Sequence, residues 1–304
     1  YTVFHELKSG HIQLDDKVRV SEKAWRMIGS KMFIEVGKHV SVEELLKGMI
    51  IQSGNDASVA LAEFVAGSED AFVPLMNAHA ERLGMKNTHF SNSTGLPADD
   101  LHSTPLDMAL LAAALIREFP EYYSWYSEKK YTFNNITQSN RNLLLFRDDS
   151  VDGLKTGHTE AAGYCLVASA KRENMRLITV VMGTSSEKAR AQESQKLLNY
   201  GFRFYETHQL YAADKPLKEM RIWKGEVETL PLGLAEELYV TVPRGQYSEL
   251  NASMRVGKTL IAPISAGSSL GTVSVKLGDE TLAERPLVAL QDVAEGGLWQ
   301  KLKD

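Results

Sequence analysis

The segment Lys155–Thr159 contains residue types that could take part in serine acyl transfer. A serine attacks an amide or lactam carbonyl after losing its proton, and a lysine accepts that proton only where burial or neighbouring positive charge lowers its pKa. Lys155 is the candidate lysine. The Thr156 hydroxyl could bind a substrate carboxylate, Gly157 could let the substrate backbone approach, and the His158 N–H could help to form an oxyanion hole. The His158 side chain could shape the pocket, or only its backbone could matter.

A second polar element, Ser53-Gly54-Asn55, lies about a hundred residues earlier and can stand as the S-D-N motif that accompanies K-T-G. Ser53 could relay a proton to the leaving group, and Asn55 could donate its amide N–H to the substrate. Taken alone, K-T-G could be an ordinary strand end and Ser53-Gly54-Asn55 an ordinary helix-ending turn. Their order, spacing and contexts, a helix joint and a strand, favour acyl transfer.

The nucleophile of such a site is the serine of an S-x-x-K motif, and no convincing match precedes Ser53. Two formal matches come later, at 127–130 and 185–188. The first lies in a charged stretch, and the second lies where the next helix begins, so we reject both. The 304 residues therefore contain no predicted nucleophilic serine.

Two kinds of element must position these residues. Between Ser41 and about Pro120 the apolar residues follow the helical period. The predicted N-caps of the helices are Ser41, Asp56, Ser68 and Thr104. Ser53-Gly54-Asn55 then falls in a joint between two helices. Between Val151 and Thr184 the pattern changes to a β-hairpin, and 187–204 is again helical.

The chain divides near residue 206. Beyond it, short strand patterns at 238–242, 259–262 and 271–275 are separated by Gly, Pro, Asn and Asp. We therefore predict an α+β domain over 1–206, a helical cluster combined with an antiparallel sheet. A small all-β sandwich follows over 207–304.

The composition excludes several function classes. With 34 Lys and Arg against 39 Asp and Glu, the net charge of −5 and the scattered cations make nucleic acid a poor partner. Cys165 is the single cysteine, so a disulfide within the chain cannot form. No histidine forms a ligand-spaced pair with a carboxylate motif, and we predict no metal site.

The residue patterns at both ends of the chain predict parts of helices. Val3, Phe4 and Leu7 share one helical face, yet nothing before Tyr1 could cap that helix, so we expect residues upstream of it. At the other end, the segment 297–304 opens an amphipathic pattern with apolar residues at 298, 299 and 302.

Across nearly its whole length the chain resembles the low-molecular-mass penicillin-binding proteins of the D-alanyl-D-alanine carboxypeptidase 5/6 type. The similarity covers the two motifs and their flanks. It is carried by the segments 51–57, 85–90, 140–142, 151–159, 201–204 and 263–272. The resemblance implies an exported enzyme, active without a metal or other cofactor, that removes the terminal D-alanine of peptidoglycan pentapeptides. An acyl-serine intermediate is expected, as is acylation by β-lactams.

Carried over residue by residue, the resemblance makes Ser53, Asn55 and Lys155 catalytic. It makes the following residues substrate-binding: Thr156, Gly157, His158, Thr159 and Arg141. The serine and general-base lysine of S-x-x-K are then expected just upstream of Tyr1. The family also implies a periplasmic protein, peripheral on the outer face of the inner membrane, which it reaches through a C-terminal amphipathic helix.

Two other functions fit the same residues. A β-lactamase of the same fold would need a base for deacylation, which nothing in the sequence marks. A non-catalytic peptidoglycan-binding protein would keep the cleft but lack the nucleophile.

Overall fold

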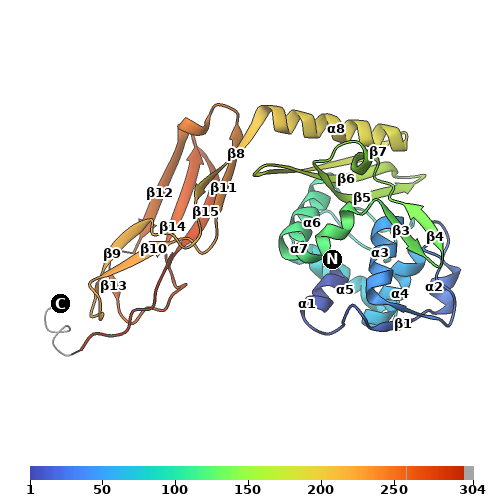
Figure 1. Cartoon of the computed structure of the whole chain (residues 1–304), viewed down its shortest axis with the longest axis horizontal. Coiled ribbons are helices and arrows are strands. Elements are labelled where there is room, and N and C mark those ends of the chain that lie inside the picture. Colours follow the sequence, from blue (N-terminus) through green and yellow to red (C-terminus); the bar gives the residue numbers. More distant parts are fainter. Residues whose placement is uncertain (258, 298–304) are drawn as a thin grey trace. The chain divides into compact units, whose positions relative to one another are not determined.

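The computed structural model describes residues 1–257 and 259–297 (Figure 1). They form two compact units. One consists of Tyr1–Arg172 with Arg176–Gly201, and the other consists of Glu173–Met175 with the described residues from Phe202 onward.

The first part of the chain is mostly helical. Its helices are α1 (Thr2–Lys8), α2 (Glu22–Arg26), α3 (Val42–Gln52), α4 (Asn55–Ala66), α5 (Glu69–Arg82), α6 (Pro105–Glu118), α7 (Pro120–Tyr123) and α8 (Glu187–Phe204), with 3-10 turns η1 (Ser124–Ser127) and η2 (Leu143–Phe146). Its strands are β1 (Lys17–Arg19), β2 (His39–Ser41), β3 (Lys130–Phe133), β4 (Ile136–Ser139), β5 (Val151–Thr159), β6 (Gly163–Arg172) and β7 (Met175–Thr184).

Three of the predicted caps are confirmed. Ser41 and Glu44 form the predicted capping box at α3, with Glu44 N–H donating to Ser41 Oγ at 3.2 Å and Ser41 N–H donating to Glu44 Oε2 at 2.9 Å. Ser68 caps α5 and Thr104 caps α6 through their hydroxyl oxygens.

The predicted cap at Asp56 is wrong, because α4 has Gly54 as its N-cap and Asp56 lies in its first turn. The Asp56 carboxylate is nearly fully buried and accepts backbone N–H bonds from another segment. The donors are Met32, Phe33 and Ile34, at 3.0, 2.9 and 3.2 Å. A carboxylate that holds a distant loop satisfies more buried donors than one that closes its own helix end.

The sheet has the strand order β5-β6-β7, so β5 is an edge strand. Strands β5 and β6 are antiparallel, with Lys155 opposite Val167 and Gly157 opposite Cys165. The helical cluster covers one face of this sheet and α8 covers the other (Figure 1). The core of the cluster includes Phe4, Leu45, Leu61, Phe119 and Leu154, so the sheet and the helices share one apolar interior.

The second unit is a C-terminal β domain, as the sequence predicted. Its elements are β8 (Tyr205–Tyr211), β9 (Lys218–Trp223), β10 (Thr229–Gly233), β11 (Leu238–Pro243), η3 (Tyr247–Glu249), β12 (Leu250–Val256), β13 (Leu260–Ile261), β14 (Ser269–Leu277) and β15 (Glu280–Ala289). One sheet has the order β12-β14-β15-β10-β9-β13, and β11 pairs with β8. Both sheets contribute to a single core that contains Leu230, Val240, Val273 and Leu287.

Of the amphipathic segment expected at 297–304, residues 298–304, which include its apolar positions, lie outside the described residues. Within 1–257 and 259–297, no helix combines the length and the apolar character needed to span a bilayer.

Candidate active site

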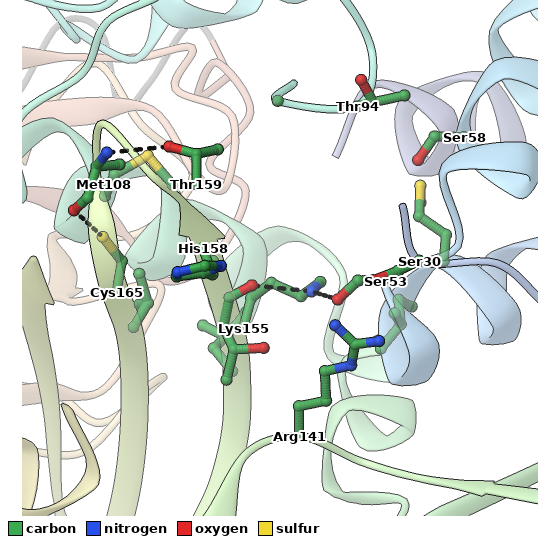
Figure 2. Close-up of a pocket in the computed structure, with 18 of the residues that line it drawn as sticks. Ser30, Ser53, Ser58, Thr94, Met108, Arg141, Lys155, His158, Thr159 and Cys165 are labelled. Atoms are coloured by element: carbon green, nitrogen blue, oxygen red, sulfur yellow. Dashed lines mark hydrogen bonds between the residues drawn. The ribbon is translucent and has the colours of Figure 1, made fainter. Parts of the chain in front are cut away.

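The sequence-predicted site residues lie around one pocket of about 830 Å³ in the first unit (Figure 2). It is formed by the joint between α3 and α4, the edge strand β5, and parts of α6 and α8. The predicted residues that line it are Ser53, Asn55, Arg141, Lys155, Thr156, Gly157, His158 and Thr159. Ser127 and Ser185, from the two rejected S-x-x-K matches, are not among its lining residues.

Ser53 faces the edge strand because the chain turns sharply at the joint. It is the C-cap of α3 and adopts the left-handed conformation, with φ 59° and ψ 38°. In this conformation its hydroxyl accepts a hydrogen bond from Lys155 Nζ. Lys155 Nζ also donates to the backbone carbonyl of Thr156, at 3.1 Å. The two motifs therefore meet through a direct contact between side chains (Figure 2).

Lys155 lies in an environment that disfavours its charged form. Burial lowers its pKa from 10.5 to about 7, with further contributions from the positive charges of Arg141 and Arg190. A lysine with this pKa carries a free amine in a substantial fraction of molecules at neutral pH. Lys155 can therefore both accept and return a proton.

Asn55 is fixed by the loop that precedes β2. Its side-chain Nδ2 donates to the Ile28 carbonyl at 2.7 Å, and its backbone N–H donates to the Ser30 carbonyl at 2.8 Å. One of the two N–H groups of the Asn55 side chain therefore donates a hydrogen bond within the protein. The Asp56 carboxylate accepts hydrogen bonds from the backbone of residues 32–34 in the same loop. Hydrogen bonds from two neighbouring residues therefore join this loop to the α3–α4 joint.

The packing of the protein does not explain why Gly157 is a glycine. A Cβ added there would meet only the Cβ of Cys165, at the ordinary distance of 3.8 Å, and its backbone has no positive φ. By contrast, a Cβ at Gly54 would crowd Asp56 Oδ1 at 3.0 Å and the backbone nitrogen of Met32 at 3.2 Å. Gly54 is therefore needed by the fold, whereas the room at Gly157 is available to a bound molecule.

Two arginines give the pocket its positive charge. Arg141, in the loop before η2, points toward Ser53 and Lys155 (Figure 2). Arg190, on α8, has an exposed fraction of only 2% and donates from Nη1 to the Gly157 carbonyl at 3.2 Å. Its Nη2 is buried and lies 3.6 Å from Glu187 Oε1, but it has no hydrogen-bond partner among the described residues. An anion at this end of the pocket would satisfy that donor.

Arg190 was not predicted from the sequence. A signal was available, because the buried side of α8 runs through Arg190, Ala191, Ser194, Leu198 and Gly201, and arginine is rarely buried without a partner or a function.

His158 and Thr159 lie at the outer end of β5. The His158 ring is exposed and lies 3.9 Å, centroid to centroid, from the ring of Tyr164 on β6. The Thr159 hydroxyl accepts a hydrogen bond from the Ala162 N–H at 3.0 Å and so closes the turn between β5 and β6. Thr159 therefore lines the pocket while its hydroxyl oxygen supports the turn.

The model of the D-alanyl-D-alanine carboxypeptidase family matches residues 1–186, and that of the penicillin-binding protein 5 C-terminal domain matches 205–295. The chain is 44% identical to D-alanyl-D-alanine carboxypeptidase DacA of Escherichia coli, over 100% of this chain and 77% of that protein. Among solved structures it is similar to penicillin binding protein 5 from Haemophilus influenzae. The TM-score is 0.84 at 42% identity, over 97% of this chain and 88% of that one. Penicillin binding protein 6B from Escherichia coli matches with a TM-score of 0.74 at 38% identity, over 95% and 84%.

Proposed function

Because this chain belongs to the D-alanyl-D-alanine carboxypeptidase family, we propose that Lys155 and Ser53 move the protons of the family's reaction. Members of the family act on peptidoglycan peptides that end in D-Ala-D-Ala, and they bind β-lactams. The observation that carries this assignment is the hydrogen bond from Lys155 Nζ to Ser53 Oγ, in a pocket that lowers the pKa of Lys155 to about 7.

We place the nucleophilic serine and the general-base lysine of S-x-x-K on residues that precede Tyr1. Tyr1 lines the same pocket as Ser53 and Lys155, and α1 begins at the next residue. A helix that reaches the pocket wall at this point can present a serine to both partners. One helical turn separates the serine and lysine of S-x-x-K, so both would project from the same face.

In the proposed reaction, the general-base lysine takes the proton of the nucleophilic serine and passes it through Ser53 to the free amine of Lys155. The serine oxygen attacks the carbonyl carbon of the penultimate D-alanine and forms a tetrahedral oxyanion. The C–N bond then breaks. The nitrogen of the departing D-alanine takes a proton from Ser53, which Lys155 resupplies. Water hydrolyses the acyl-serine ester in a second step. A β-lactam is attacked in the same way, but its leaving nitrogen stays attached to the acyl group.

We assign the remaining residues to substrate binding. The backbone N–H of His158 belongs to the oxyanion hole, and Asn55 and the edge strand around Gly157 hold the peptide. The terminal carboxylate is bound by Thr156 with Arg141 and the buried guanidinium of Arg190, whose Nη2 lacks a hydrogen-bond partner among the described residues. Guanidinium groups suit this task because they bind carboxylates with paired N–H donors.

We further propose that residues 1–206 are the catalytic domain and that 207–304 are a spacer or partner surface. A peptidoglycan substrate requires the enzyme to work in the cell envelope. We propose the periplasm, with peripheral attachment to the outer face of the inner membrane through a C-terminal amphipathic helix. The protein should stay in a washed membrane fraction, and a variant that ends at residue 296 should be lost from that fraction.

The function is tested with labelled penicillin and a D-Ala-D-Ala pentapeptide, using the protein with the residues that precede Tyr1. We expect stable acylation and release of one D-alanine per peptide. Sustained β-lactam turnover would instead support the β-lactamase alternative. Peptidoglycan binding with neither acylation nor D-alanine release would support the non-catalytic alternative.

A further inference from the structure

A second cluster of polar side chains lies beside the pocket, where α1, α5 and α6 meet. The Tyr1 hydroxyl donates to Glu118 and accepts from Arg82. Arg82 Nη2 also donates to His5 Nε2 at 2.8 Å and lies 3.4 Å from Glu118 Oε2. The ring of His79 stacks on that of His5, with centroids 4.5 Å apart. Neither motif of the active site includes these residues.

The geometry of the cluster requires a neutral His5 and disfavours a charged His79, whose ring stacks on that of His5. Arginine has no acceptor, so His5 Nε2 can accept from Arg82 only when that nitrogen carries no proton. Protonation of His5 would remove this hydrogen bond and place two cations in contact. Protonation of His79 would add a third positive charge against the His5 ring. Burial and the neighbouring charge of Arg82 accordingly lower the pKa of His5, and burial together with His5 and Arg82 lowers that of His79 to about 4.

The surrounding carboxylates do not offset these charges fully. Glu118 is held ionised, because hydrogen bonds from Tyr1, Arg117 and Arg82 outweigh its burial and lower its pKa to about 2. It faces Arg82 and Arg117, and its Oε2 atom lies 3.8 Å from His5 Nε2, so its single charge is shared among three groups. On α1, Glu6 pairs with His11 at 2.7 Å, and Lys8 donates to the Glu118 backbone carbonyl at 2.9 Å.

Helix α4 also packs against α1, but its carboxylates are used elsewhere. Asp56 accepts hydrogen bonds from the 32–34 backbone. Glu63 helps to raise the pKa of Lys23, and neither carboxylate is among the groups that shift the pKa of His5 or His79. Among the described residues, Glu118 and Glu6 favour the charged form of His5 and Glu6 favours that of His79, but burial and the charge of Arg82 outweigh them.

We propose that His5, His79, Arg82 and Glu118 are positioning residues that hold α1, and with it Tyr1, at the wall of the catalytic pocket, and that protonation of the two histidines weakens this hold. The inference rests on the proposed function, because Tyr1 then leads to the segment that carries the nucleophile. The consequence is a loss of acyl transfer in mildly acidic surroundings in addition to the loss that protonation of Lys155 produces.

The direction of the pH effect is set by proton linkage. Both histidines have a lower pKa in the folded cluster than in an opened one, so the open state binds more protons below about pH 6.5. The hold on α1 is therefore complete near pH 7 and is lost as the pH falls toward 4.

The test is amide hydrogen exchange at pH 7 and pH 5, in the protein with the residues that precede Tyr1. The reference is a H5Q/H79F double variant, in which glutamine keeps an acceptor for Arg82 and phenylalanine keeps the stacked ring. In the wild type, we expect the protection factors of α1 amides, relative to those of α3, to fall about tenfold on acidification. In the double variant the ratio should stay constant.

Labelled penicillin gives a second readout. The ratio of acylation rates at pH 5 and pH 7 should be lower in the wild type than in the double variant, because Lys155 is common to both proteins. The single variant His79→Phe should show an intermediate response. The same pH response of α1 in wild type and variants, or parallel changes of α1 and α3, would overturn the proposal. Absence of acylation in both proteins at each pH would contradict the proposed function, and the exchange ratio alone would then decide on the cluster.

Discussion

Lys155 Nζ donates a hydrogen bond to Ser53 Oγ, although the two residues lie 102 positions apart in the chain. One comes from the edge strand of a sheet and the other from the joint between two buried helices. The contact joins an amine whose pKa is about 7 to a hydroxyl that opens into the pocket. This arrangement can carry a proton in either direction between the lysine and a bound molecule.

The charge of Arg141 should set the pH range of the enzyme. Burial is the main reason why the Lys155 pKa is low, and Arg141 contributes next. Arg141→Gln should therefore raise the Lys155 pKa and move the acid limb of the acylation profile upward, by up to about one pH unit. Acylation rates measured from pH 5 to 9 check this. Arg147→Gln, at the next arginine of the chain, is the control and should leave the limb in place.

The same pKa has a consequence for stability. Because the Lys155 pKa falls from 10.5 to about 7 on folding, the unfolded state binds more protons between these values. The contribution of Lys155 to the free energy of unfolding therefore rises with pH over this range. Below pH 7 both states bind the proton and the full cost of burying the cation remains.

Arg190 should act on the substrate carboxylate. Arg190→Ala should lower kcat/KM for a D-Ala-D-Ala peptide by about tenfold to a hundredfold, the usual cost of losing hydrogen bonds to a charged group. The matched substrate is the same peptide with a C-terminal amide, for which the variant and the wild type should differ little. An equal loss on both substrates would show that Arg190 acts through the fold.

Asp56 should stabilise the loop that holds Asn55. Asp56→Asn removes the charge that accepts the N–H groups of 32–34 and puts an amide donor in the same place. We expect the free energy of unfolding in urea to fall by roughly 2 to 4 kcal/mol. The exposed Asp15 gives the control, and Asp15→Asn should change stability by less than about 0.5 kcal/mol. Equal stabilities of the two variants would contradict the role given to the Asp56 carboxylate.

Much of this molecule could be predicted because its local signals agree with its fold. The capping box at Ser41 and the caps at Ser68 and Thr104 are local hydrogen bonds, which sequence spacing specifies directly. The helical and strand patterns predicted the fold class, and the two motifs with the segments around them predicted the family. The comparisons confirm both.

The rest depends on contacts between distant segments. Asp56 looked like a cap because a polar residue beside a helix usually is one, and only the folded chain brings the 32–34 backbone to it. Arg190 is a charged residue on the buried side of α8. Its hydrogen bond to the Gly157 carbonyl forms only because the fold brings β5 next to α8. The cluster around Arg82 requires three helices to meet, which no local pattern specifies.

We propose that Lys155 moves a proton, and the variant Lys155→Arg isolates this role because arginine keeps the positive charge but cannot release a proton in a protein. The measurement is the rate of D-alanine release and of penicillin acylation from pH 5 to 9, with the exposed Lys188→Arg as control. We predict that the wild-type and control rates rise through about pH 7, and that Lys155→Arg is slower by roughly a hundredfold or more and has no such limb. A Lys155→Arg enzyme with the wild-type rate and the same pH profile would contradict the account.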